Sequence, residues 1–556
     1  MSTFDFTKYQ ATATVQMPNR EWPNRVITKA PIWASVDLRD GNQALLEPMN
    51  VQQKQKFWAL LIKLGFKEIE IGFPSASKPD YDFIRWLIEE DQIPDDVTVQ
   101  ALVQAREELI VKTFQALKGA KRAIVHVYNS TSTVQRERVF GMDKDGIKNI
   151  ACFGAKLLKQ EAQKYPDTQW TFEYSPESFT GTEMDYAVEV CNAVIDIWQP
   201  TVDKPCIINL PSTVENATPN IFADQVEYFS NNVNNRDRII LSVHTHNDRG
   251  CAVAASELAL LAGANRVEGC LLGNGERTGN LDIITLAMNL YSQGIDPKLD
   301  ISNPDEIISV VTECTKIPVH PRHPWVGDMV YTAFSGSHQD AIRKCLHVQT
   351  ENEHWQVAYL PINPEDLGRD YQAVIRVNSQ SGKGGVAFVM ERDYGIVLPR
   401  WIQVELALLV QQKSEHHSGE IDSKTIYDIF TNYFVLDQDP NSLQSYQINR
   451  VTNLDEIKLT LAKNNTNFTI DGSGEGTLSA VVDACEKHFG VQINVTDYSE
   501  HALGEGTDVQ AIAFISLNIN GRRVSGVSMD HDTVSASMKA LISALNRFQL
   551  EQVEAA

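Results

Sequence analysis

A short apolar segment, a polar end and an amphipathic stretch recur eight times between residue 32 and about residue 290. The apolar segments have the length and composition of buried β-strands, and the stretches between them have the periodicity of helices. The strands are expected at 32–37, 68–73, 98–104, 123–128, 170–175, 206–210, 239–244 and 267–272. The clearest helices are expected at 51–64, 81–90, 147–164, 184–198 and 252–262. Eight such units over roughly 260 residues favour an α/β fold with a closed parallel (β/α)8 (TIM) barrel over a doubly wound open sheet.

The rest of the chain predicts a helical linker region and then a small α+β domain. Residues 317–346 carry three prolines before a polar helical segment, and residues 401–413 have the pattern of another helix. Strands are expected further on at 457–461, 468–470, 493–495, 511–519 and 523–528, and helices at 478–489 and 533–548. These elements form two similar units, which suggests a weak internal repeat. The expected domains are a barrel with an N-terminal extension, a linker region and an α+β domain, at 1–305, 306–435 and 436–556.

The composition is that of a soluble globular enzyme, and it argues against two classes of partner. A formal net charge of -23 disfavours nucleic acid and anionic membranes as main partners. No apolar run approaches the ~20 residues that span a bilayer, and we expect no signal peptide. Eight scattered cysteines without a C-x-x-C motif indicate a reducing compartment, so we expect a cytoplasmic protein.

Polar side chains gather at the predicted strand ends, which is where parallel barrels of this type have their active sites. The main groups are Asp37–Gln43, His126 with Tyr128, Glu173–Glu177, Asn209–Thr213 and Gly273–Asn280. Each group taken alone could be a solvated loop. Their convergence on one rim of the barrel favours a functional site.

The segment Ser242–Asp248 contains two histidines at the end of the seventh predicted strand. Strand alternation points His244 and His246 to the same face, although such a pair alone is at least as well explained by hydrogen-bonded core histidines. Asp40 follows the first strand and Asn280 the eighth, and barrel closure brings strands one, seven and eight side by side. One carboxylate, two imidazoles and an amide oxygen suit Mg²⁺ or Mn²⁺, with Zn²⁺ as an alternative, acting as a Lewis acid toward a carbonyl.

Two charged residues near these four keep more than one interpretation. Arg39 could form a structural ion pair, or it could stabilise negative charge that develops on a substrate oxygen. Glu177 could be a general base, a partner of Arg39 or a solvated loop charge. The spacing of Glu177 from Ser175 puts both residues on one face of the strand.

Three glycine-rich stretches do not match nucleotide-binding motifs. Gly273–Gly279 follows the last barrel strand and lacks the βαβ position of a dinucleotide fingerprint. Ser381–Gly384 lacks the first glycine and the Ser or Thr of a phosphate-binding P-loop. Gly472–Gly476 is predicted to be a tight turn into a helix, whose backbone amides could bind a carboxylate.

Several segments together resemble the Claisen-condensing acyltransferases related to HMG-CoA lyase, and most closely the 2-isopropylmalate synthases of the longer bacterial type. The matching segments are Asp37–Gln43, Phe172–Glu177, Asn209–Glu215, His244–Asp248, Gly273–Asn280, Ser335–Asp340 and Asn378–Gly385. The resemblance covers nearly the whole chain. It implies a condensation of acetyl-CoA with 3-methyl-2-oxobutanoate, which gives 2-isopropylmalate and CoA in the first committed step of leucine biosynthesis.

The resemblance also implies roles for individual residues. It makes Asp40, His244, His246 and Asn280 the ligands of a divalent metal that chelates the 2-oxo acid. The pocket for this acid would be lined by Arg39, His126, Tyr128, Ser175, Glu177 and Thr213. The catalytic residues would be Arg39, Glu177, His338 and Tyr359. His338 and Tyr359 would help to activate acetyl-CoA at the partner subunit's site, which implies an interlocked homodimer, and the terminal region would bind leucine as a feedback inhibitor.

Three alternatives stay open. Homocitrate or citramalate synthesis would use another 2-oxo acid, and a substrate with a distal carboxylate would need an extra cation that Phe73 and Leu102 do not supply. A metal-dependent hydrolase with a barrel commonly carries its H-x-H motif near the first strand rather than the seventh. A leucine-sensing binding protein with an inert barrel is the non-enzymatic alternative, and the intact metal set argues against it.

Overall fold

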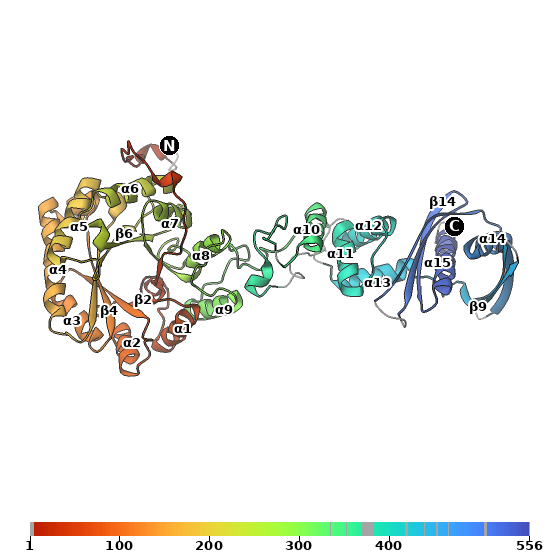
Figure 1. Cartoon of the computed structure of the whole chain (residues 1–556), viewed down its shortest axis with the longest axis horizontal. Helices are drawn as coiled ribbons and strands as arrows, with labels where there is room; N and C mark the ends of the chain where they lie inside the picture. Colours follow the sequence, from red (N-terminus) through yellow and green to blue (C-terminus); the bar gives the residue numbers. More distant parts are fainter. Residues whose placement is uncertain are drawn as a thin grey trace. The chain divides into compact units, whose positions relative to one another are not determined.

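The computed structural model describes residues 5–333, 335–351, 353–369, 383–417, 421–438, 440–451, 454–464, 466–504 and 509–554. The chain divides into two compact units. The first unit contains Met1–Val330 and Asp366–Gly368, and the second contains Tyr331–Glu365 and Arg369–Ala556. The two units are described separately below, with the element labels of Figure 1.

In the described part of the first unit, eight parallel strands close into the predicted barrel, in the order β1 to β8 (Figure 1). The strands are β1 Ile32–Ser35, β2 Glu68–Gly72, β3 Thr98–Gln104, β4 Arg122–Ser130, β5 Gln169–Glu177, β6 Cys206–Ser212, β7 Ile239–Thr245 and β8 Arg266–Gly269. β1 pairs with β2 on one side and with β8 on the other, and β7 pairs with β8. This closure brings the ends of β1, β7 and β8 together although they are far apart in the sequence.

Helices surround the barrel (Figure 1). They are α1 Val51–Leu64, α2 Lys78–Glu89, α3 Glu107–Leu117, α4 Lys144–Ala162, α5 Met184–Trp198, α6 Pro219–Asn232, α7 Ala252–Leu261, α8 Ile283–Tyr291 and α9 Pro304–Thr315. Of these, α9 packs against α1 outside the layer that the other helices form. α1 shows how the sequence fixes these boundaries. The Asn50 side chain accepts from the Gln53 amide in a capping box, and the helix ends at Gly65 in the left-handed conformation.

The first and eighth strands end earlier than the sequence pattern predicts. Residues Asp37–Gly41 form a π-helical turn and residues Leu271–Gly273 form a 3-10 turn. The Asp37 carboxylate accepts from the Leu271 amide at 3.0 Å, which ties the two turns together beyond the sheet. A strand pattern does not reveal this contact, because it joins residues from opposite ends of the barrel sequence. By contrast, β4 and β5 continue beyond their predicted ends, to Ser130 and Glu177.

The second unit begins with helices and ends with the predicted repeat. The helices are α10 Gly336–Val348, α11 Lys383–Tyr394, α12 Arg400–His417 and α13 Ser423–Phe434. Within the described residues, two three-stranded antiparallel sheets follow, each continuing into one helix. The two repeats are β9 Ser442–Val451, β10 Leu454–Lys463, β11 Thr466–Gly474 and α14 Thr477–Phe489, then β12 Ile493–Ala502, β13 Ala511–Ile519, β14 Arg522–Asp530 and α15 Thr533–Glu554. The sequence pattern missed β9, whose side chains are mostly exposed.

Two expectations from the sequence concern the 378–385 motif and the absence of a membrane span. Most of the predicted 378–385 motif lies outside the described residues, since 370–382 are not among them. Among the helices that are described, none is both long and apolar enough to span a bilayer.

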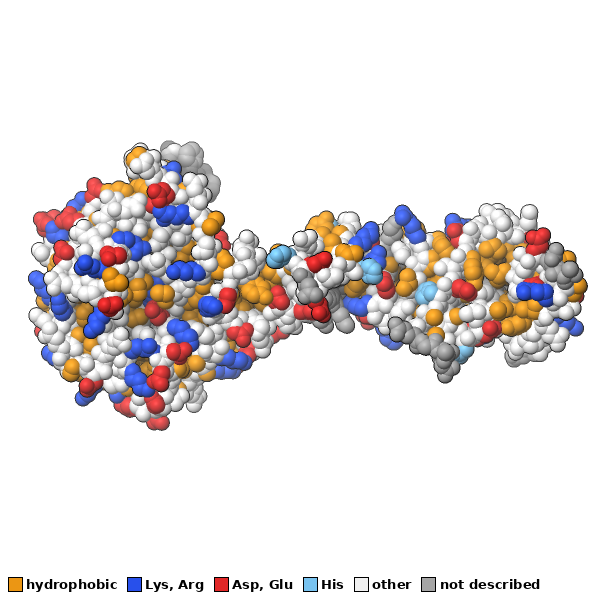
Figure 2. All heavy atoms as spheres, in the orientation of Figure 1, with side chains coloured by type: hydrophobic (Ala, Val, Ile, Leu, Met, Phe, Trp, Pro, Cys, Tyr) orange, Lys and Arg blue, Asp and Glu red, His pale blue; other side chains and the backbone are white. Residues whose placement is uncertain are grey.

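Figure 2 shows acidic and basic side chains intermixed over the visible face of the barrel, so this face is not uniformly positive or negative.

Each repeat of the second unit packs a strand glycine directly against a helix. A Cβ on Gly526 of β14 would lie 2.3 Å from the Ala540 carbonyl oxygen of α15. A Cβ on Gly472 of β11 would lie 2.5 Å from the Ala480 carbonyl oxygen of α14. The two repeats therefore share the same close approach of strand and helix, which only glycine permits.

We expect Gly526→Ala to destabilise the terminal repeat by about 1–3 kcal/mol, because the added methyl group overpacks the contact between β14 and α15. Gly476→Ala is the matched control, because its Cβ would meet no described atom within 4 Å. Thermal unfolding of the full chain, with hydrogen exchange of β14 and α15, measures the difference. Equal effects of the two substitutions would contradict this account of the packing.

Candidate active site and metal centre

A cavity of about 170 Å³ lies at the carboxyl ends of the barrel strands. Every barrel residue predicted from the sequence lines this cavity except Asn280, which is buried directly beside it. The polar part of the lining comes from the ends of β1, β4, β5, β6 and β7 and from the loop after β8, and Phe73 and Leu102 form an apolar part. The polar residues at the strand ends therefore line one cavity rather than separate loops.

The four residues predicted to bind a metal meet at one edge of the cavity. Asp40 Oδ2 lies 3.3 Å from His244 Nε2 and 3.9 Å from His246 Nε2. The two Nε2 atoms are 3.3 Å apart. Asn280 Nδ2 donates to Asp40 Oδ2 at 2.6 Å, and an isolated bridge pairs Asn280 with His246. Barrel closure thus produces the juxtaposition that the strand positions predicted.

The chemistry of this group fits a divalent cation. Ligand atoms of Asp40, His244 and His246 lie within 4.8 Å of one another, and all three residues are buried. Among the described residues, the buried atoms His246 Nδ1 and Asn280 Oδ1 have no hydrogen-bond partner. Rotation of the Asn280 amide would turn this oxygen toward the other three residues. Carboxylate, imidazole and amide donors around one point match the preferences of Mg²⁺ and Mn²⁺, and they also accommodate Zn²⁺.

The charge states of Asp40, His244 and His246 depend on one another. Burial opposes ionisation of Asp40, but Arg39 and His244 hold the pKa of its carboxyl well below the usual range. Burial also disfavours the charged form of His244, yet hydrogen bonds to Asp40 and Glu268 raise the pKa of His244 to about 9. Burial and the neighbouring His244 lower the pKa of His246 to about 3. A metal ligand must be the neutral imidazole, so a cation at this point would compete with protonation of His244.

Arg39 is buried between two carboxylates at the wall of the cavity. Its Nη1 donates to Asp40 Oδ1 at 2.5 Å, and its Nε donates to Glu70 Oε2 at 2.5 Å. Arg39 thus forms the ion pairs of the structural interpretation, and it also lines the cavity. Glu177 has a different partner, since the Ser130 hydroxyl donates to its carboxylate.

The remaining predicted pocket residues present hydrogen-bonding groups on two adjacent strands and one loop. His126 Nε2 and Ser175 Oγ are 2.7 Å apart across β4 and β5. The Tyr128 hydroxyl accepts from Gln104 at 3.1 Å. Thr213 Oγ1 accepts from the Ser178 amide at 2.9 Å, which fixes the loop after β6 against the end of β5.

The glycine-rich loop after β8 shapes the backbone behind Asn280. Gly279 has a φ of 96°, and a Cβ on it would lie 2.0 Å from the Gly273 carbonyl oxygen. A Cβ on Gly275 would lie 2.4 Å from Asn280 Oδ1. The spacing of glycines in this motif is therefore a requirement of the turn that presents Asn280.

His338 and Tyr359 lie in the second unit, on α10 and in the loop that follows it. Their rings stack with centroids 3.9 Å apart and an interplanar angle of 22°. Tyr359 has a φ of 65°, which is unusual for a residue with a side chain, and its side chain is exposed. The sequence alone did not indicate this stacking.

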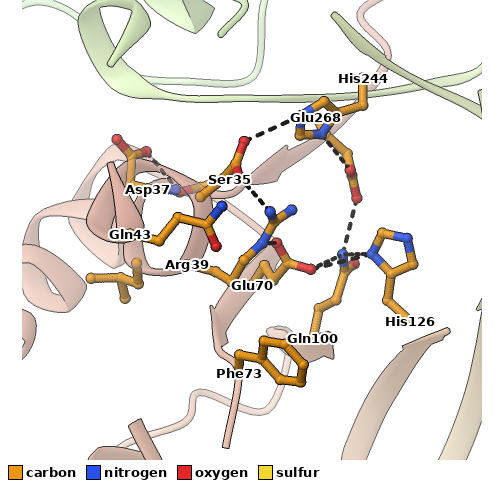
Figure 3. Close-up of polar contacts among 12 residues, drawn as sticks. Ser35, Asp37, Arg39, Gln43, Glu70, Phe73, Gln100, His126, His244 and Glu268 are labelled. Carbon is orange, nitrogen blue, oxygen red and sulfur yellow. Dashed lines mark hydrogen bonds and ion pairs between the residues drawn. The ribbon is translucent and has the colours of Figure 1, made fainter. Parts of the chain in front are cut away.

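Reasoning from strand ends missed most of a polar network in the interior of the barrel, of which it singled out only Glu173. Its members lie on the barrel strands and do not line the cavity. They are Glu70 on β2, Gln100 on β3, Glu173 on β5, and Arg266 and Glu268 on β8. Figure 3 shows three of them, Glu70, Gln100 and Glu268, beside Arg39 and His244. The available signal was the presence of charged residues inside otherwise apolar strands, where burial requires a partner.

A buried lysine supports the turn that carries Arg39 and Asp40. Lys54 on α1 donates to the Leu38 carbonyl at 2.9 Å and to Asp80 Oδ1 at 2.6 Å. The other oxygen of Asp80 accepts from the Phe73 amide at 2.8 Å. The ion pair thus joins the π-helical turn after β1 to the loop after β2.

We expect Lys54→Met to lower the free energy of unfolding by about 3–5 kcal/mol, because it leaves the Asp80 carboxylate buried without its cation. Lys56→Met is the matched control on the same helix, since Lys56 pairs with Glu313 in solvent and such pairs contribute about 0–1 kcal/mol. Denaturant unfolding of the full chain measures both effects. A loss no larger for Lys54→Met than for Lys56→Met would contradict the role of the buried pair.

Comparison with known protein families covers nearly all of the chain. A family model described as HMGL-like matches residues 30–311, which include the barrel. A model described as alpha-isopropylmalate synthase, post-catalytic domain-like, matches residues 328–391. A model described as LeuA allosteric (dimerisation) domain matches residues 420–549.

Full-length relatives agree with these matches. A 2-isopropylmalate synthase from Alcanivorax borkumensis is 53% identical over 548 residues, and the alignment covers 98% of each chain. A 2-isopropylmalate synthase from Pseudomonas entomophila is 52% identical over 547 residues, again with 98% of each chain covered. The barrel with its convergent polar rim, the three matched regions and this similarity show that the chain belongs to the 2-isopropylmalate synthase family of acyltransferases.

Proposed function

We propose that the protein condenses acetyl-CoA with 3-methyl-2-oxobutanoate to give 2-isopropylmalate and CoA. The observation that carries this proposal is the meeting of Asp40, His244, His246 and Asn280 beside Arg39 in one cavity. Relatives that are about half identical over the whole chain carry the name of this activity. We further propose a cytoplasmic location, on the ground of the cysteine pattern.

Asp40, His244, His246 and Asn280 would hold the divalent metal, with Mg²⁺ as the first choice. Such an ion supplies Lewis acidity to the keto group of a bound 2-oxo acid. Arg39 contributes a fixed positive charge beside the developing alkoxide, and its pairing with Glu70 keeps the guanidinium in place before the reaction. The rim thus provides stabilisation of negative charge without reorganisation of the chain.

The walls of the cavity favour a small branched 2-oxo acid. Phe73 and Leu102 present apolar surface where a distal carboxylate would need a cation. The hydrogen-bonding groups of His126, Ser175 and Thr213 come from β4, β5 and the loop after β6, and they suit the carboxylate end of the substrate. This arrangement favours 3-methyl-2-oxobutanoate over 2-oxoglutarate, the substrate of homocitrate synthesis.

Removal of a proton from the acetyl methyl group requires a base close to the thioester. Glu177 lines the cavity and has a hydroxyl group as its hydrogen-bond donor, so its carboxylate is a candidate for this role. His338 and Tyr359 form a stacked pair and are the candidates from the second unit. By resemblance to the family, we assign this pair to the site of the partner subunit in a homodimer, and we assign leucine inhibition to the terminal repeats.

A thiol-release assay with acetyl-CoA and a panel of 2-oxo acids tests the reaction. We expect fastest turnover with 3-methyl-2-oxobutanoate, dependence on a divalent metal, and a lower rate when leucine is added. Asp40→Asn should reduce turnover by at least about 100-fold, because it removes the anionic ligand. Fastest turnover with 2-oxoglutarate would favour homocitrate synthesis, and leucine binding without CoA release would favour the non-enzymatic alternative.

Asp37→Asn is the matched control for Asp40→Asn. Asp37 lies on the same turn and is buried, but it accepts from the Leu271 amide and does not line the cavity. Burial raises the pKa of Asp37 to about 7, so asparagine resembles a form that this side chain readily adopts. Turnover should therefore survive in Asp37→Asn, and a loss equal to that of Asp40→Asn would overturn the assignment of Asp40 as a ligand.

Mixed dimers test the shared site. Chains with His338→Ala and chains with Asp40→Asn should each be inactive alone, because each substitution damages every site in its own homodimer. When the two chains are co-expressed in equal amounts, half of the dimers are mixed and contain one intact site, so about a quarter of wild-type turnover should return. No recovery in a preparation shown to contain mixed dimers would place His338 in the site of its own chain.

A further inference from the structure

The polar network in the barrel interior connects the two charged parts of the site. Glu70 holds Arg39, and Glu268 on β8 lies against His244 (Figure 3). Gln100 on β3 joins them, because its Nε2 donates to Glu70 Oε1 at 3.1 Å and to Glu268 Oε1 at 3.0 Å. With the contacts of Asp40 to Arg39 and His244, these residues complete a ring of polar contacts.

The two histidines of the metal centre differ in how they are held. His244 Nδ1 lies 2.9 Å from Glu268 Oε2, so this nitrogen donates a hydrogen bond to the carboxylate. A neutral imidazole with its proton on Nδ1 has a lone pair on Nε2, which here points toward Asp40 and His246. Among the described residues, His246 Nδ1 has no hydrogen-bond partner. Of the two histidines, only His244 therefore has a side chain that holds its Nδ1.

Glu268 is itself fixed in position by three donors. Arg266 Nη1 and Gln100 Nε2 donate to its Oε1, each at 3.0 Å, and Asn209 Nδ2 donates to its Oε2 at 3.1 Å. The side chains of Glu268 and Arg266 are fully buried. A carboxylate with this many fixed partners has little freedom to rotate, so it determines the orientation of the imidazole that donates to it.

A second carboxylate in the same cluster lacks this relation to the metal centre. Glu173 is fully buried and lies 3.2 Å from Arg266 Nη1, as Glu268 does at 3.0 Å. Its nearest histidine is His126, at 3.8 Å, and not a predicted metal ligand. Substitution of either carboxylate therefore removes a contact to Arg266. Only substitution of Glu268 also removes the hydrogen-bond acceptor of His244 Nδ1.

We propose that Glu268 is a positioning residue of the metal centre, which holds the His244 imidazole with its Nε2 lone pair directed at the metal. The proposal rests on the proposed function, since it requires a metal at Asp40, His244 and His246. It goes further by naming the side chain on which the geometry of the ligand depends. Gln100 also hydrogen-bonds Glu70, which holds Arg39, so the positions of the metal ligand and of the guanidinium are fixed relative to each other.

Binding of Mn²⁺ to the full-length protein, followed by electron paramagnetic resonance of the free ion without substrates, tests the proposal. Glu268→Gln should raise the dissociation constant for Mn²⁺ by about 10–100-fold, which is the usual effect of losing such a partner. Glu173→Gln is the matched control, and its dissociation constant should stay within about threefold of the wild type. Wild-type affinity in folded Glu268→Gln, or equal weakening in both variants, would overturn the proposal.

Glu268→Asp provides a second variant that keeps the negative charge beside Arg266. Shortening the side chain by one methylene group withdraws the carboxylate from His244 Nδ1, so Mn²⁺ binding should again weaken, and thermal unfolding without metal checks that the variant stays folded. Wild-type affinity in this variant would also overturn the proposal.

Asp40→Asn separates failure of this proposal from failure of the proposed metal site. If Asp40→Asn abolishes Mn²⁺ binding and Glu268→Gln leaves it unchanged, only the role of Glu268 is wrong. If Asp40→Asn also leaves Mn²⁺ binding unchanged, the metal site is wrong and the role of Glu268 falls with it.

Discussion

The pairing of β1 with β8 is the contact on which the site depends. It places the turn carrying Arg39 and Asp40 beside the loop that carries Asn280, and β7 then adds its histidines from the other side of β8. Gly269 at the end of β8 makes the junction possible, because a Cβ there would lie 2.7 Å from the Leu281 carbonyl oxygen. The geometry of the site is therefore a consequence of barrel closure rather than of any local motif.

Barrel closure also buries charged side chains, and ion pairs in the barrel interior offset part of the free-energy cost of removing them from water. Arg39 and Arg266 are opposed by Glu70 and Glu268, whose carboxylates they contact directly. Burial raises the pKa of Glu173 well above its usual value, which favours the neutral acid at this position. Arg39 also pairs with Asp40 and Arg266 with Glu68, and fixed hydrogen bonds satisfy most of the polar atoms of these residues. Buried ion pairs are weak evidence for net stability, but fixed charges suit a site that must stabilise developing charge.

Sequence periodicity predicted the parts of the fold that depend on local pattern. The bounds of β3, α1 and α5 agree with the prediction to the residue, because each has a regular apolar face and a clear boundary. The ends of β1 and β8 were wrong, since the contact of Asp37 with the Leu271 amide joins distant segments. β9 was missed because few of its side chains are buried, so the apolar signal was too weak.

The candidate site shows the same division between local and distant information. Strand alternation and barrel order were sufficient to bring Asp40, His244, His246 and Asn280 together, because both follow from simple geometry. The partners Gln100 and Glu268 required knowledge of which interior side chains meet across the barrel, since β3 and β8 are not neighbours in the sheet. The sequence gives strand order directly, but the length and rotamer of each interior side chain decide these contacts.

The second unit imposes a physical condition on any signal from its terminal repeats. Strand β13 is buried on both faces: Ala513 and Ile515 pack toward α14 and α15, while Ile512 and Phe514 share a core with α11, α12 and α13. A ligand that shifts β13 must therefore repack the helices as well as its own repeat, because close-packed cores do not deform continuously. Truncation near residue 435 would expose the side of this core formed by the helices. A loss of inhibition after such a truncation would therefore combine loss of the ligand site with damage to the helices, whereas single substitutions in the intact chain separate the two.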